Sequence, residues 1–121
     1  MTLWMNQLKN IAAKVASYSI KAADIGVTFT NRAATAAITF TLPPTGDLPS
    51  GWWCDFHVVD ADGIVIASLG SADNIIAGND TGADSITITT ASLTIGAYGR
   101  VLWDGTSWIF ARGGFGTYTV A

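Results

Sequence analysis

The chain carries a cysteine and a histidine close enough in sequence to suggest a catalytic thiol–imidazole pair. Cys54 and His57 are the single residues of their kinds among 121. A thiol nucleophile needs an imidazole base within hydrogen-bond reach. On a β-strand, however, positions three apart point to opposite faces. We therefore interpret Cys54 as a buried structural residue and His57 as a surface or interface residue.

A pair of aspartates imitates the start of a calcium-binding loop. Asp60-Ala61-Asp62-Gly63 places its glycine at the fourth position, whereas the calcium loop needs it at the sixth. The twelfth position is Ser71 instead of a bidentate glutamate. Aspartate side chains also bond the backbone that follows them in turns. We therefore assign this run to a turn, and we predict neither a metal nor a cofactor.

The charged residues argue against an enzyme and against a nucleic-acid partner. All nine acidic residues are aspartates, and the formal net charge is −3. A glycosidase needs two carboxylates around the scissile bond, and no pattern here places a pair in a cleft. The negative charge excludes the basic footprint of a nucleic-acid-binding domain, and one cysteine excludes multi-cysteine zinc sites. Because only 12% of residues are charged, we expect part of the surface to be covered by other subunits.

The elements that would position these residues are mostly β-strands. From Ser19 onward, apolar and polar residues alternate with a period of two, as in strands with one buried face. Polar or proline-rich turns interrupt the pattern at 43–49, 60–63 and 78–84. The predicted strands cover 27–30, 38–42, 52–58, 64–68, 74–77, 85–89, 99–103, 108–112 and 116–120. This spacing predicts an antiparallel β-sandwich or a jelly-roll-like domain over residues 19–121.

The tryptophans divide between core and surface by the same alternation. Trp52 shares its parity with Cys54, so we place it in the core, whereas Trp53 points the other way and is a candidate surface contact. Trp103 and Trp108 flank Asp104-Gly105, the strongest hairpin signal of the chain. We expect these two rings to pair across that hairpin.

The first residues show a different period. Residues 2–17 contain neither glycine nor proline, which favours a short N-terminal α-helix within a segment 1–18. The apolar steps alternate between three and four, as at the a and d positions of a coiled coil. Such a helix could pack on its own domain, associate with copies of itself, or dock on another protein. The residues of this apolar stripe, candidates for oligomerisation or capsid contact, are Met1, Trp4, Leu8, Ile11, Val15 and Tyr18.

Several short motifs together resemble a known group of proteins. The first is Asp24-x-Gly26-x-Thr28-Phe29-x-Asn31, and the last is Asp104-Gly105-Thr106-x-Trp108. Between them, and just before them, lie Tyr18-Ser19-Ile20, 38–43, Asn74-Ile75 and 98–102. This pattern resembles the small β-modules of tailed-phage virion proteins, which occur in head fibres, capsid decoration proteins and the ends of tail fibres.

The resemblance implies a non-catalytic homotrimer on the capsid surface, made in the host cytoplasm and bound to the major capsid protein or another virion protein. A chain this short favours a decoration or head-fibre protein over a long tail fibre. The alternative is a tail-fibre or carbohydrate-binding module that recognises a receptor, with a glycan as the less favoured partner. We expect no membrane partner, because no stretch approaches the roughly 20 apolar residues that span a bilayer.

Overall fold

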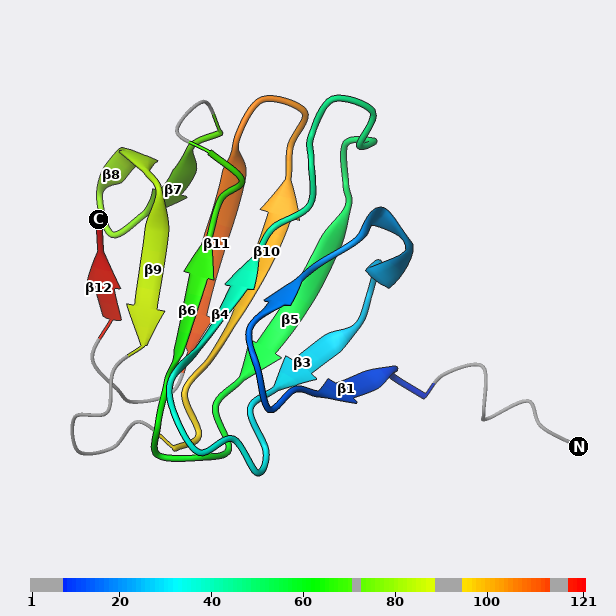
Figure 1. The fold of residues 1–121 in the computed structure, drawn as a ribbon. Helices are drawn as coiled ribbons and strands as arrows, with labels where there is room; N and C mark the ends of the chain where they lie inside the picture. The colour runs from blue at the N-terminus through cyan, green and yellow to red at the C-terminus, as the bar shows by residue number, and fades with distance from the viewer. Residues whose placement is uncertain (1–7, 71–72, 89–94, 114–117) are drawn as a thin grey trace, which may run out of the picture.

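Two β-sheets lie face to face in the computed structural model, which describes residues 8–70, 73–88, 95–113 and 118–121 (Figure 1). The seven-stranded sheet has the order β1 (Ile11–Ala13), β3 (Thr28–Thr30), β5 (Trp53–His57), β10 (Tyr98–Trp103), β11 (Trp108–Gly113), β7 (Ile75–Ala77) and β8 (Asp80–Ala83). The five-stranded sheet has the order β12 (Tyr118–Val120), β9 (Ser85–Ile88), β6 (Ile64–Ala67), β4 (Ile38–Thr41) and β2 (Tyr18–Ser19). One 3₁₀ turn, η2, covers Ala22–Asp24. The prediction of a mainly β fold is confirmed.

The sheets are mixed, so the predicted antiparallel arrangement is wrong for half of the pairings. Strands β1, β3 and β5 run parallel to one another, and so do β2, β4 and β6. The reason lies in the path of the chain, which alternates between the two sheets from β1 to β6. Each crossing reverses the chain, so a strand that returns to its own sheet runs in its original direction. Turn residues alone do not distinguish such a crossing from a hairpin within one sheet.

The predicted N-terminal helix is wrong for every part of it that the structure describes. Residues 8–17 contain strand β1 and no helical turn, while Met1 and Trp4 lie outside the described residues. The backbone of this segment pairs with β3 instead, where Thr28 N donates to Asn10 O at 2.7 Å and Lys14 N donates to Thr30 O at 2.9 Å. A short helix is marginal without tertiary packing. These hydrogen bonds to β3 therefore outweigh the helical preference that the apolar spacing of three and four residues indicates.

The core lies between the sheets and is centred on three phenylalanines. Phe29 from β3, Phe40 from β4 and Phe56 from β5 are each at most 1% exposed. Their ring centroids lie 5.3–5.8 Å apart, so Phe40 of the five-stranded sheet contacts both rings of the other sheet. Trp52 and Cys54 are also buried, as the alternation predicts.

Three motif residues of the segment 24–31 make contacts that shape the fold. Asp24 accepts hydrogen bonds from Tyr18 Oη and Lys21 N, both at 2.9 Å. Gly26 has a φ of +75° and lies against the ring of Trp53. The fully buried Asn31 holds the 59–63 turn with four hydrogen bonds. The motif that carries the resemblance therefore has a structural role in this chain.

The hairpin at Asp104-Gly105 is confirmed. Trp103 and Trp108 face each other across β10 and β11, with ring centroids 5.3 Å apart. Asp104 Oδ1 accepts from Ser107 N at 2.7 Å and Thr106 N at 2.8 Å, and these two bonds hold the pKa of that carboxyl below its usual value. A second hairpin, joining β7 to β8, was not predicted; its turn residues Gly78 and Asn79 both have positive φ.

Substituting Gly105 with valine should destabilise the hairpin by about 1–3 kcal/mol. The φ of Gly105 is +96°, and a Cβ there would come within 2.6 Å of Ser50 Oγ. The matched control is Gly46→Val, because a Cβ at Gly46 meets nothing within 4 Å. Thermal unfolding of both variants checks this, and equal melting temperatures would contradict the strained turn.

Candidate functional site

The outer face of the seven-stranded sheet presents its polar and aromatic side chains in cross-strand rows. Pairing of β5 with β10 sets His57 beside Tyr98, Asp55 beside Arg100, and Trp53 beside Leu102. The alternation of β5 sends these three residues outward and buries Cys54 and Phe56 behind them. We call the group of Lys9, Trp53, Asp55, His57, Tyr98 and Arg100 the β5–β10 cluster.

Asp55 is the electrostatic centre of this cluster. Arg100 Nε and Nη2 donate to its two oxygens at 2.6 and 3.1 Å, and Lys9 Nζ donates to Oδ2 at 2.7 Å. Burial by itself would raise the pKa of Asp55, but the hydrogen bonds and charges of Arg100 and Lys9 outweigh it and lower that pKa. A carboxylate held ionised in this way cannot serve as a general acid near neutral pH.

Replacing Asp55 with asparagine should lower the free energy of unfolding at pH 7 by about 1–2 kcal/mol, because charge-assisted hydrogen bonds are lost while both cations remain half exposed to water. The pKa of Asp55 is lower in the folded protein than in the unfolded chain, where it is about 4. The stability that the Asp55 carboxylate contributes is therefore fully present above about pH 4 and is lost as the pH falls through the folded-state pKa. Urea unfolding at pH 7 and pH 3 should therefore show the gap between wild type and variant closing. A gap of equal size at both pH values would contradict the assignment.

Trp53 lies outward as predicted, but its ring is already occupied by cations. Arg100 Cζ lies 4.3 Å and Lys9 Nζ 4.7 Å from the ring centroid. Gly26 N also donates to the carbonyl of Trp53 at 2.8 Å. The half-buried ring therefore positions the two cations that hold Asp55, and it is not an open platform.

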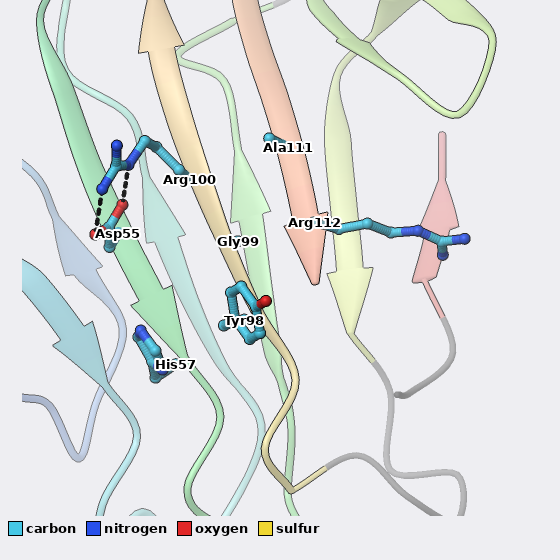
Figure 2. Close-up of a pocket in the computed structure, with 7 residues that line it drawn as sticks. All are labelled: Asp55, His57, Tyr98, Gly99, Arg100, Ala111 and Arg112. Atoms are coloured by element: carbon cyan, nitrogen blue, oxygen red, sulfur yellow. Dashed lines mark hydrogen bonds and ion pairs between the residues drawn. The ribbon is translucent and has the colours of Figure 1, made fainter. Parts of the chain in front are cut away.

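His57 and Tyr98 form the exposed end of the cluster. Their rings stack at 5.5 Å with 17° between the planes. Beside them is a depression of about 360 Å³, lined by Asp55, His57, Tyr98, Gly99, Arg100, Ala111 and Arg112 (Figure 2). The side chain of Arg112 extends away from Arg100 toward β12, so the charged wall of this depression is the Asp55–Arg100 pair (Figure 2).

Cys54 and His57 lie on opposite sides of β5, as the alternation predicts, so their side chains do not face each other. His57 is exposed, whereas Cys54 is buried, and burial raises the pKa of its thiol well above the usual value. Asp60 accepts from Asp62 N at 3.3 Å, as expected of an aspartate in a turn. Within the described ranges, no group of three or more His, Cys, Asp or Glu residues could hold a metal ion.

The apolar stripe predicted at the N-terminus does not form a common surface of a helix. Leu8, Ile11 and Val15 are 60–72% exposed; Ile11 lies on strand β1, and Leu8 and Val15 lie in bends on either side of it. Tyr18 is half buried on β2, where its ring lies 5.7 Å from that of Phe29. In the described part of the chain, no helix is long and apolar enough to cross a membrane.

The outer face of the five-stranded sheet carries no charged side chain among the described residues. The strand pairings align this face into two rows across β2, β4, β6, β9 and β12. Most of its side chains are half buried, because small and β-branched residues shield one another. We call this surface the uncharged face; it consists of Ser19, Thr39, Thr41, Val65, Ala67, Ser85, Thr87 and Thr119.

Searches with this sequence against protein-family models and against curated proteins return no match. The arrangement of the two outer faces therefore carries the functional argument. Sequence reasoning singled out Trp53 and His57 but missed Asp55 and Arg100. The alternation places Asp55 on the same face as both predicted residues, but no sequence signal pairs it with Arg100.

Proposed function

We propose that this protein is a non-catalytic structural module of a tailed-phage virion, which acts as a homotrimeric capsid decoration or head-fibre protein. The observation that carries the proposal is the uncharged face. Depletion of charge is the compositional mark of the centre of a protein–protein interface. Two rows of threonine, serine, alanine and valine share this lack of charge, so a neighbouring subunit of the trimer would cover them without burying a charged group.

The rest of the molecule supports a structural role. The carboxylate of Asp55 is neutralised by Lys9 and Arg100, and the thiol of Cys54 is buried on the other side of β5. The motif residues Asp24, Gly26 and Asn31 stabilise the fold.

A charge placed on the uncharged face tests the trimer. Thr87 lies between Val65 and Thr119 in one row, so Thr87→Asp places a carboxylate inside the proposed contact. We expect a smaller particle mass for this variant in light scattering, with the melting temperature of the monomer domain retained. Thr35→Asp is the control, because Thr35 is exposed outside the strands. An unchanged mass for Thr87→Asp would show that this face is not the subunit contact.

Binding to virions tests the location. Purified protein should co-sediment with phage heads that lack it, and added phage glycan receptors should not compete. Failure to bind heads in any oligomeric state would contradict the virion assignment.

Glycan binding is the second candidate function, favoured by the depression beside the stacked His57 and Tyr98 rings. An aromatic ring with adjacent ionic groups offers both an apolar face and hydrogen bonds to a sugar. Titration with host surface glycans should then change tryptophan fluorescence through Arg100 and Trp53, and Tyr98→Ala should remove that change. No response to such glycans would exclude this function and leave the structural role.

A further inference from the structure

Strand β1 forms one edge of the seven-stranded sheet and, within the described residues, pairs with β3 alone (Figure 1). Its paired stretch extends from Asn10, whose carbonyl accepts from Thr28 N, to Lys14, whose amide donates to Thr30 O. In a parallel ladder, alternate residues direct their amide and carbonyl to the same side. Asn10, Ala12 and Lys14 therefore face β3, whereas Ile11 and Ala13 direct theirs away from the sheet.

Apart from the shortness of β1, which has three residues, this edge lacks the protection that sheet edges normally carry. Charged side chains and bulges usually prevent a free edge from pairing with another chain. At the opposite edge, β8 has both: its ladder with β7 is irregular, and Asp80 Oδ1 accepts from Gly82 N at 2.8 Å. Beside β1, in contrast, Ile11 is 72% exposed.

The two lysines that flank β1 do not place their charges at its free edge either. Lys9 is turned onto Asp55 at 2.7 Å, over the outer face of the sheet. Lys14 Nζ lies 3.8 Å from the ring centroid of Tyr18. Both charges are thus engaged within their own subunit. The amides and carbonyls of Ile11 and Ala13 have no hydrogen-bond partner among the described residues, and they lie next to exposed apolar side chains.

We propose that β1 pairs with β1 of a second copy of this chain, antiparallel and around a two-fold axis at Ala12. Ile11 then lies opposite Ala13 of the partner subunit, and the two such pairs exchange four backbone hydrogen bonds. Ala12 lies opposite its own copy as a non-hydrogen-bonded pair, as required because its amide and carbonyl are directed to β3. The same sequence thus supplies both sides of the contact, as a two-fold interface requires.

The charges select this orientation of the second copy. In the antiparallel register, Lys14 lies opposite the uncharged Asn10 of the partner subunit. A parallel pairing would bring Lys14 of both copies next to each other, and like charges across strands are destabilising. The contact joins two seven-stranded sheets into one continuous sheet and leaves the uncharged face free. It therefore goes beyond the proposed trimer and does not depend on the location of the protein in a virion.

A proline substitution tests the contact without disturbing the subunit. Ala13→Pro removes an amide that has no partner among the described residues, and edge strands tolerate proline at such positions. We expect this variant to have half the wild-type mass in sedimentation velocity, whether the wild type is a dimer or a pair of trimers. Ala13→Ser keeps the amide and should keep the wild-type mass. A wild-type mass for Ala13→Pro would overturn the proposal.

A cross-linking experiment tests the register and does not need the proline variant to fold. Across a non-hydrogen-bonded pair the Cα atoms lie about 4.5 Å apart, within the range of a disulfide. Ala12→Cys should therefore form disulfide-linked dimers under mild oxidation. In Ile11→Cys the new cysteine lies opposite Ala13 of the partner subunit and not opposite its own copy, so we expect several-fold fewer cross-linked dimers. Equal cross-linking of the two variants, or none, would overturn the two-fold axis at Ala12. If Thr87→Asp lowers the particle mass and Ala13→Pro does not, the proposed trimer is supported and the β1 contact is refuted.

Discussion

Replacing Phe40 with alanine is expected to lower the free energy of unfolding by about 4 kcal/mol, the usual cost of a large cavity in a closed core. Phe40 has no exposed surface, and its ring lies 5.3 Å from both Phe29 and Phe56. These neighbours belong to the opposite sheet, so the cavity would open between the sheets and neither sheet could fill it alone. Chemical denaturation measured by tryptophan fluorescence gives the value.

Two further variants make this prediction specific. Phe40→Leu keeps most of the buried volume and should cost about 1–1.5 kcal/mol. Phe110→Ala removes the same side chain from a half-buried position next to Tyr118 and should cost clearly less than Phe40→Ala. If Phe40→Ala costs no more than Phe110→Ala, the two sheets do not pack against each other through Phe40.

Asn31→Ala should cost about 3 kcal/mol, although it removes only a small side chain. Asn31 Oδ1 accepts from the amides of Val59 and Asp60 at 2.9 and 3.0 Å, and Nδ2 donates to the carbonyls of Asp60 and Gly63 at 3.1 and 3.4 Å. The side chain is fully buried, so water does not readily replace it. Removing it leaves several backbone groups without partners in the turn that joins β5 to β6.

The neighbouring Arg32 provides the control for Asn31, because it is exposed and Arg32→Ala should change stability by less than about 0.5 kcal/mol. Hydrogen exchange adds a local readout: in Asn31→Ala the amides of Val59 and Asp60 should lose protection first. Full protection of these amides in the variant would mean that Asn31 does not hold the turn.

The alternation of side chains allowed much of the sandwich to be predicted from the sequence. Burial of one parity and exposure of the other decided the positions of Trp52, Cys54 and His57, because the hydrophobic effect acts on each strand whatever its partner is. The hairpin at Asp104-Gly105 was also predictable from local sequence, because an Asp-Gly pair favours the positive φ that a tight hairpin turn requires.

The remaining features depend on pairings that are distant in the chain. Residues 10–14 become extended because β3 provides hydrogen bonds, and no local signal reports that partner. The sequence predicts a turn at 78–84, where β8 lies, since Asp80 and Gly82 disfavour strands, yet its pairing with β7 overrides that preference. The Asp55–Arg100 pair joins residues 45 positions apart, so only the register of β5 and β10 reveals it.

Imaging of purified particles decides whether this chain is a structural subunit that coats a virion. Electron cryomicroscopy of phage heads, with and without the gene for this chain, should show density for the two-sheet module in many symmetry-related copies on the outer surface of the shell, and this density should be absent without the gene. Finding the protein in no part of the particle, or only as a few copies at the tail tip bound to a host glycan, would contradict the proposed role.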